Sequence, residues 1–284
     1  MPDDKGRNVR GVSVIIPTVR LDHWLDLAVE SILGSVGVDV DLVVVHDGVE
    51  PDRALSWTND PRVQLVHHAN RRGQTAGMQS GLARARFDLI ARLDADDLST
   101  PNRLQQQVAY LDDHPHAVAV GSRVMRMSAD GTDQGEMVLA VGADVRRQLL
   151  FQNVVAHSSL MFRRDTSLIV GGYDEHLVQM EDYDFIMRLA LRGEIAVIDE
   201  ILTRYRVHPQ QTSRGAAPWG PHIDRVLADR VALRRVLRAG RAASTIKNVI
   251  WCGVQYARYF RIIRPGYERA GRRVSHRSGR AGRP

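Results

Sequence analysis

The sequence predicts an α/β protein with a mostly parallel, doubly wound sheet that carries helices on both faces. Short, compact apolar runs such as 12–17 and 41–48 alternate with longer segments in which apolar residues recur at helical spacing. Several of these runs end in polar or acidic residues, and parallel sheets of this kind bind ligands at that edge. With 284 residues and 44% hydrophobic content, the chain can form one large α/β domain or one domain with an appendage.

The first half of the chain alternates predicted strands and helices. Thr18 follows the first strand, Asp47 ends the second, and Asp94 follows the fourth. Because right-handed crossovers bring the carboxyl ends of parallel strands to one edge, we expect these residues to line one cleft. The predicted order is a strand at 12–17, a helix at 21–35, strands at 41–48 and 63–66, a helix at 73–86, and a strand at 87–93.

The second half predicts shorter strands and an irregular middle region. A helix that begins near residue 181 should bury its apolar face, formed by Phe185, Ile186, Leu189 and Ala190. The other predicted elements are a helix at 101–114, a strand at 117–124, a loop or hairpin at 127–142, a helix at 144–151, a strand-like segment at 157–162, and short strands at 195–198 and 201–206.

Two amphipathic helices, at 221–239 and 245–263, are predicted to form a C-terminal appendage at 213–263. Basic and aromatic residues flank the apolar side of the second helix, which consists of Ile246, Val249, Ile250, Val254, Ala257 and Phe260. Such a helix can pack on the domain or lie on an anionic membrane surface, and both interpretations stay open.

The formal charge of +6 is confined to the end of the chain. Residues 264–284 carry seven arginines and one glutamate, so residues 1–263 are formally neutral. A tail rich in Gly, Arg and Ser is typical of a disordered segment, and we expect no nucleic-acid binding by the folded part.

Features that report on localisation are few. The N-terminal lead at 1–11 is polar and has no apolar signal-peptide core, and no segment reaches the roughly 18 apolar residues of a membrane helix. The single cysteine, Cys252, excludes an internal disulfide and fits a reducing compartment. We therefore expect a cytoplasmic protein, with a peripheral position on the cytoplasmic membrane face as an option.

Three carboxylates within four residues, in the segment Asp94–Asp97, follow the fourth predicted strand. Carboxylates this close repel one another, and a hard divalent cation with oxygen ligands is the usual compensation. A calcium loop does not fit, because its later ligand positions would fall on Leu98 and Gln105. The alternative is an acidic turn that leads into the helix begun by residues 99–101.

The common nucleotide fingerprints are absent from the sequence. It contains neither Gly-x-Gly-x-x-Gly nor a Gly-Lys-Ser/Thr phosphate loop, which disfavours a dinucleotide oxidoreductase or a P-loop enzyme. A helix that begins near Gly73, preceded by Arg71 and Arg72, can instead meet a diphosphate through backbone donors and charge. A solvated loop is the alternative for these arginines.

Several short motifs follow one another along the chain: Ser13–Thr18, Asp47-Gly48, the Gly-rich helix start near 73, Leu93–Asp97, Asn153–Arg163, Gly171–Glu175, Glu181–Asp184 and Tyr205–His208. Their order and spacing resemble a family two glycosyltransferase of the GT-A fold. The resemblance spans residues 12–212, with a nucleotide-sugar half at 12–100 and an acceptor half at 101–212.

The resemblance implies an inverting, metal-dependent transfer from a nucleoside-diphosphate sugar, with UDP- or dTDP-sugars favoured and Mn²⁺ or Mg²⁺ as the cofactor. The acceptor would be a saccharide or a lipid-linked saccharide, in bacterial-type synthesis of cell-surface polysaccharide or glycolipid. It also implies that Asp182 is the general base, whereas the residues alone also allow it to stabilise the first turn of its helix. The resemblance also implies that Asp47 contacts the base imide, that Asp94 contacts the ribose side, and that Asp96 and His208 bind the metal. The other candidate residues for donor binding are Pro17, Thr18, Arg72 and Ala95. The candidates for the acceptor side are His157, Gly172 and Glu181: Gly172 can let a substrate approach closely, and a structural role is the alternative for His157.

The chain departs from the family pattern at two places. The usual Asp-Asp-Gly-Ser turn is here His46–Val49, and the usual Ala-Arg-Asn-x-Gly segment is here Gly77–Gly81. Two other functions stay open. A sugar-phosphate nucleotidyltransferase would need a Gly-rich, basic segment after the first strand, and a non-catalytic protein would bind membrane or nucleic acid through the tail.

Overall fold

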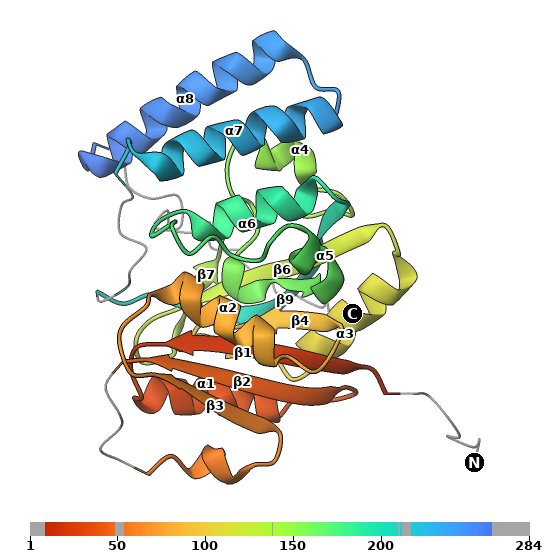
Figure 1. Cartoon of the computed structure of the whole chain (residues 1–284), viewed down its shortest axis with the longest axis vertical. Coiled ribbons are helices and arrows are strands. Elements are labelled where there is room, and N and C mark those ends of the chain that lie inside the picture. Colours follow the sequence, from red (N-terminus) through yellow and green to blue (C-terminus); the bar gives the residue numbers. More distant parts are fainter. Residues whose placement is uncertain (1–8, 49–53, 138, 210, 212–216, 263–284) are drawn as a thin grey trace, which may run out of the picture.

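In a computed structural model, the chain folds into one nine-stranded sheet with helices on both faces, which confirms the predicted fold class (Figure 1). The structure describes residues 9–48, 54–137, 139–209, 211 and 217–262. The tail at 264–284, most of the lead at 1–11 and the boundary at 212–213 lie outside the described residues.

The sheet has a parallel part followed by a mixed part. Its strand order is β3-β2-β1-β4-β8-β6-β9-β5, with β7 paired to β6. The first four of these strands are parallel, whereas β8 is antiparallel to both of its neighbours. The sheet is therefore more mixed than a mostly parallel prediction implies. The strands are β1 Gly11–Thr18, β2 Asp39–Asp47, β3 Val63–His68, β4 Leu89–Arg92, β5 Leu98–Ser99, β6 Ala117–Met127, β7 Asp133–Glu136, β8 Met161–Arg163 and β9 Glu194–Arg206.

Alternation along the strands divides the core into two layers. In β1, Val14 and Ile16 pack toward α1 and α3, while Ile15 packs toward α2 and α6. The helices are α1 His23–Leu33, α2 Gln74–Arg84, α3 Arg103–Asp113, α4 Arg146–Leu149, α5 Arg164–Ile169, α6 Glu181–Ala190, α7 Pro221–Val236 and α8 Arg241–Tyr259, with short 3₁₀ segments at Ser56–Asn59 and His157–Ser159.

The C-terminal helices α7 and α8 form further layers outside α6 (Figure 1). The buried side of α8 consists of Ser244, Trp251 and Gln255, and the Trp251 ring lies 5.0 Å from the Arg230 guanidinium of α7. The apolar side points the other way, since Ile246 and Val249 are 59% and 68% exposed. The helix thus packs on the body through the face opposite to its apolar stripe. Among the described residues, no helix combines the length and apolar character needed to cross a bilayer.

Three sequence predictions need correction. The strand-like segment 157–162 begins as a 3₁₀ turn, and only Met161–Arg163 form the strand β8. The two short strands at 195–198 and 201–206 are one strand, β9, whose pairing with β6 contains register shifts. The helix expected at 144–151 is a single turn. The first two differences arise from sheet pairing and register shifts, which local periodicity does not encode.

Candidate active site

The acidic segment forms a tight turn beyond the carboxyl end of β4. The backbone N–H of Asp97 donates to the carbonyl of Asp94 over 3.1 Å, which closes the turn. The N–H of Asp94 donates to Ser158 Oγ over 3.0 Å and ties the turn to the 3₁₀ segment. One carboxylate oxygen from each of Asp94, Asp96 and Asp97 lies within 4.8 Å of the others. This set of hard oxygen donors fits Mn²⁺ or Mg²⁺.

The surroundings of the turn also favour a cation. Burial raises the pKa of Asp94; Arg92 opposes this shift, and Asp96 and Asp182 reinforce it. Burial, followed by the charges of Asp96 and Asp94, raises the pKa of Asp97 well above its usual range. Ionised carboxylates are therefore disfavoured here until more positive charge is present.

His208 lies directly beside Asp96, although 112 residues separate the two in the sequence. Its Nε2 is 2.7 Å from Asp96 Oδ2, and the imidazole is buried against the Trp24 ring, with centroids 4.6 Å apart. The antiparallel pairing of β5 with β9 brings this segment to the turn. Asp97 Oδ1 strengthens the junction by accepting the N–H of Arg206 over 2.8 Å. The structure thus brings the two predicted metal ligands together, and their role as ligands stays a prediction.

The start of α6 supplies two further carboxylates. Met180, just before the helix, has a left-handed backbone with φ of 58°, an uncommon conformation that often marks functional sites. Asp182 accepts hydrogen bonds from Asn153 Nδ2 at 2.9 Å and from the Tyr183 N–H at 2.7 Å. The second bond means that Asp182 also stabilises the first turn, so both interpretations of this residue have a structural basis.

Burial is the main influence on the acidity of this pair. It raises the pKa of Asp182 despite the opposing hydrogen bonds and the charge of Arg92. Burial and the charge of Asp182 raise the pKa of Glu181 to about 7. A carboxylate with a raised pKa is a stronger base than an exposed one, which suits proton abstraction.

Asp47 anchors the start of α2, a contact that the sequence did not predict. Its Oδ1 accepts the Arg72 N–H at 2.8 Å and approaches His68 Nδ1 at 3.0 Å, while its Oδ2 accepts the Gly73 N–H at 2.7 Å. Burial alone would raise the pKa of Asp47, but these hydrogen bonds together lower it. The carboxylate therefore fixes the loop that leads into α2.

The other predicted donor residues lie around the same strand ends. Thr18 is buried, and its Oγ1 donates to the carbonyl of Arg20 over 2.6 Å, which shapes the turn after β1. Pro17 precedes it in β1, and Ala95 lies within the acidic turn. The Arg72 side chain reaches Glu175 of the acceptor half at 3.3 Å, and both groups are about half exposed.

Two predicted acceptor residues have structural partners. His157 Nε2 is 2.7 Å from the Tyr173 hydroxyl, and burial, followed by Arg92, lowers the pKa of His157 well below its usual range. A Cβ on Gly172 would lie 2.1 Å from Gln79 Oε1, so this glycine permits a close approach to α2. We predicted close approach by a substrate at this glycine; the neighbour that the structure places there is Gln79.

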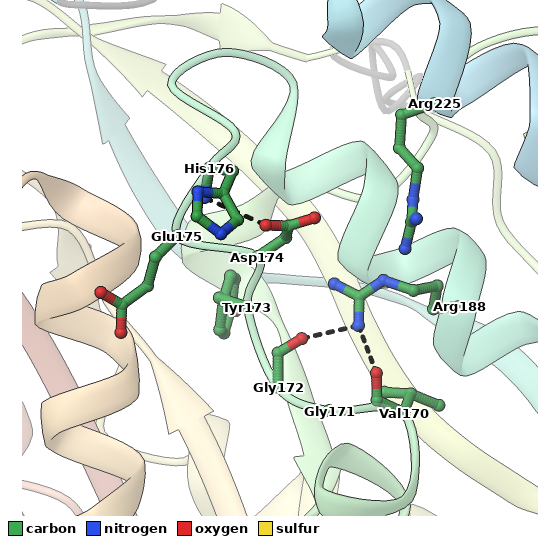
Figure 2. Close-up of a pocket in the computed structure, with 9 residues that line it drawn as sticks. All are labelled: Val170, Gly171, Gly172, Tyr173, Asp174, Glu175, His176, Arg188 and Arg225. Carbon is green, nitrogen blue, oxygen red and sulfur yellow. Dashed lines mark hydrogen bonds between the residues drawn. The ribbon is translucent and has the colours of Figure 1, made fainter.

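A cavity of about 280 Å³ lies beside this glycine loop (Figure 2). Its floor is fixed by Arg188, whose Nη1 donates to the carbonyls of Val170 and Gly172, and Arg225 points toward it from α7. The cavity is lined by residues 170–176 together with these two arginines.

Sequence reasoning missed three residues that shape the site. Arg92 is 1% exposed and its Nη2 lies 2.5 Å from Asp94 Oδ1. A charged residue inside the apolar run 87–93 was the available signal for it. Ser158 and Asn153 lie within the motif Asn153–Arg163, but nothing in the local sequence indicates their contacts with Asp94 and Asp182.

Comparisons with known proteins are consistent with this geometry. A sequence model described as glycosyl transferase family 2 matches residues 13–168. The succinoglycan biosynthesis protein ExoO of Rhizobium meliloti is 30% identical over 90% of this chain and 77% of its own length. The O-antigen biosynthesis glycosyltransferase WbnJ of Escherichia coli is 27% identical over 72% of this chain and 83% of its own length.

Another relative matches over a shorter stretch. The amylovoran biosynthesis glycosyltransferase AmsE of Erwinia amylovora is 27% identical over 58% of this chain, and the match spans 64% of AmsE. Among solved structures, S. aureus TarS in complex with UDP-GlcNAc has a TM-score of 0.67 over 87% of this chain and 72% of TarS. With 16% sequence identity, that likeness concerns the fold.

Proposed function

This chain belongs to glycosyl transferase family 2, and from that premise we propose that it transfers a sugar, with inversion, from a nucleoside-diphosphate sugar to an acceptor hydroxyl. The pathway would be synthesis of a cell-surface polysaccharide or glycolipid, as the names of its relatives indicate. The observation that carries the proposal is the gathering of Asp94, Asp96 and His208 with Asp182 in electrostatic reach.

Asp182 would act as the general base. It would take the proton of an acceptor hydroxyl as that oxygen attacks the anomeric carbon opposite the leaving diphosphate. A single displacement inverts the configuration and needs no enzymatic nucleophile. Asn153 would hold the Asp182 carboxylate in place, and the raised pKa of Asp182 would match the base to its task.

Asp96 and His208 would hold Mn²⁺ or Mg²⁺, which supplies neutralising charge for the departing diphosphate. Asp94 would contact the ribose side of the donor from the same turn as Ala95. Pro17, Thr18 and Asp47 would form the base side of the pocket. Arg72, now paired with Glu175, would reach the diphosphate.

A UDP- or dTDP-sugar is the donor class that we propose, since TarS, which shares the fold, was solved with UDP-GlcNAc and with UDP. His157, Gly172 and Glu181 would lie on the acceptor side, where the acceptor is a saccharide or a lipid-linked saccharide.

The direct test is thermal stabilisation by UDP-, GDP- and dTDP-sugars, each with and without Mn²⁺. A ligand that binds the native state raises its stability with the logarithm of ligand concentration over Kd. We expect one nucleotide class to stabilise the protein, and more strongly with Mn²⁺. Absence of stabilisation by every sugar nucleotide would contradict the proposal.

We further propose that the outward face of α8 rests on the anionic cytoplasmic face of a membrane. Ile246, Val249 and Ile250 are each about 60% exposed or more and lie on one side of the helix. Lys247 and Arg258 border the stripe, with the Lys247 ammonium 3.6 Å from the centre of the Phe151 ring, and the basic residues of 264–284 follow the stripe in the sequence. An exposed apolar stripe with basic margins fits anionic lipid, and each basic residue adds about 1 kcal/mol near such a surface.

Vesicle binding tests this placement with a matched pair of variants. Val249→Glu should reduce binding to phosphatidylglycerol vesicles, while Val178→Glu, at an apolar residue that is 90% exposed elsewhere, should leave it unchanged. Deletion of residues 264–284 should also reduce vesicle binding. The binding that remains should depend more strongly on the apolar stripe of α8. Equal binding by the Val249 and Val178 variants, or equal binding to neutral vesicles, would contradict the proposal.

A further inference from the structure

Arg92 occupies an unusual place for a charged residue. It lies in β4, which is otherwise apolar, and its side chain is 1% exposed. Because side chains alternate along a strand, Arg92 points to the same face as Ile90, the face that α2 and α6 cover. The guanidinium therefore projects from the side of β4 on which α2 and α6 pack.

Arg92 makes its close ion pair with Asp94, at 2.5 Å, at the mouth of the donor site. Among the described residues, its Nε and Nη1 are buried and have no hydrogen-bond partner. Acceptors of the described residues therefore satisfy only some of the N–H groups of the Arg92 guanidinium. Burial of an arginine is costly, so its retention requires compensation from nearby negative charge.

That negative charge comes from both sides of the cleft. Burial lowers the pKa of Arg92, but the charge of Asp94, followed by the charges of Glu181 and Asp182, outweighs this effect and raises it. The positive charge of Arg92, in addition to burial, lowers the pKa of His157. Arg92 is thus within electrostatic range of the acidic turn, the 3₁₀ segment and the start of α6.

We propose that Arg92 is a positioning residue of the transfer site: it holds the Asp94 carboxylate toward the donor and offsets the Glu181–Asp182 pair on the acceptor side. One buried cation would then link the donor and acceptor halves. This inference rests on the proposed function, because it assigns Arg92 a role in that same site. Arg92 acts through Asp94 and Asp182 and does not itself touch the reacting atoms.

Arg230 provides a matched control for removal of Arg92. It is fully buried in α7, and its Nε and Nη1 also lack hydrogen-bond partners among the described residues. Its neighbours are the Trp251 ring and the carbonyl of Leu150. Arg92→Met and Arg230→Met therefore remove the same group from equally buried places, one beside the cleft carboxylates and one away from them.

The experiment measures donor affinity, turnover and melting temperature for these variants. The probe is the sugar nucleotide that gives the largest stabilisation in the screen above, with Mn²⁺. Arg92→Met should weaken donor binding by about 10- to 100-fold, the range for loss of a charged hydrogen bond, and should also lower kcat. Arg92→Lys should recover part of both losses because it keeps the charge, while Arg230→Met should change only the melting temperature.

A double-mutant cycle with Asp94→Asn separates positioning from general destabilisation. If Arg92 acts on the donor through Asp94, Arg92→Met should weaken binding much less in the Asp94→Asn background than in the natural sequence. Independent, additive losses would overturn the inference. So would donor affinity and kcat within twofold of the natural protein in Arg92→Met or, where that variant does not fold, in Arg92→Lys.

The failure of this inference can be told apart from failure of the proposed function. If the natural protein binds no sugar nucleotide, the proposed function fails. If it binds and transfers while the Arg92 variants behave like Arg230→Met, only the role of Arg92 is refuted.

Discussion

Asp182 and Asp184 lie two residues apart on α6 and have opposite surroundings. Asp182 faces the cleft, where its hydrogen bonds come from the neutral groups of Asn153 and Tyr183. Asp184 faces α7 and is fully buried between Arg188 and Arg225, at 2.5 and 2.8 Å. One helix thus carries Asp184, which two arginines neutralise, and Asp182, for which no ion pair is found within the described part of the chain.

The same contrast holds for the groups around each residue. Between α6 and α7, Asp184 and Asp229 face two arginines. Around the cleft, the carboxylates of Asp94, Asp96, Asp97, Glu181 and Asp182 outnumber the arginines that act on them among the residues that the structure describes, which are Arg92, Arg103 and Arg206. Matched charge supports a structural role, whereas surplus negative charge marks a place for a cation and for proton transfer.

The variant Asp182→Asn gives the strongest test of this difference between Asp182 and Asp184. If Asp182 is the base, turnover should fall by roughly 100- to 10,000-fold, because asparagine cannot accept the proton. Donor affinity should change little, because other residues hold the donor. The melting temperature should fall slightly, since the amide keeps the size of the side chain but offers one acceptor oxygen where Asp182 uses two, for Asn153 Nδ2 and for the Tyr183 N–H. Initial rates measured beside calorimetric donor binding check this, and normal turnover would return Asp182 to a helix-stabilising role.

Asp184→Asn should give the opposite result. Removal of this buried charge leaves Arg188 without its carboxylate and Arg225 with only the more distant Asp229, and it should cost about 3–5 kcal/mol of unfolding free energy. Turnover per folded molecule should stay within a few-fold of the natural protein. Urea denaturation with active-site titration measures both, and a stable Asp184 variant would mean that the matched cluster is not structural.

His208→Ala tests whether an ion takes up the surplus charge of the cleft. Loss of an imidazole beside Asp96 should weaken Mn²⁺ affinity by at least about tenfold, in line with the usual effect of groups around a metal. A Mn²⁺ titration of nucleotide-dependent stabilisation reports this affinity. Replacement of the exposed His23 by Ala is the control, and an identical titration for both variants would make His208 purely structural.

Glu181→Gln should give the smallest effect, visible only through pH. The pKa of Glu181 is raised in the folded state to about 7, so its contribution favours folding below pH 4.5 and is lost as pH rises through 7. In metal-free buffer the variant should melt higher than the natural protein at pH 8, and this gain should shrink by about 2–4 °C at pH 5. Glu200→Gln, at an exposed site, should show no such trend, and parallel curves for Glu181→Gln would refute the raised pKa.

Much of the fold could be predicted from local patterns. The apolar runs at 12–17 and 41–48 became β1 and β2, and the predicted inner face of α6 is fully buried. The position of β8 between β4 and β6 could not be predicted, because a three-residue strand has no periodicity of its own. The sequence also did not predict which face of α8 packs on the body. The longer apolar stripe suggests one face, whereas the helix packs through the opposite face, where Trp251 contacts Arg230.

The site shows the same limit. The acidic turn was visible as Asp94–Asp97 after a strand, and the position of His208 came from the family resemblance. Nothing in the pattern indicates that Asp47 would be engaged by the α2 start, or that Arg92 would lie between two halves of a cleft. Partners that are remote in sequence depend on the folded topology, and local spacing carries no information about them.

The short strand β5 makes the two halves depend on each other for assembly. Leu98 and Ser99 leave the donor half immediately after the acidic turn and pair with β9 at the far side of the sheet. A fragment that ended near residue 100 would lack both this partner and the strand β8 that covers the edge of β4. During synthesis, the acidic turn of the nucleotide-binding half would therefore acquire a fixed structure only after β9 has been made and has paired with β5. We expect the protein to fold and unfold as one cooperative unit and not as two separable domains.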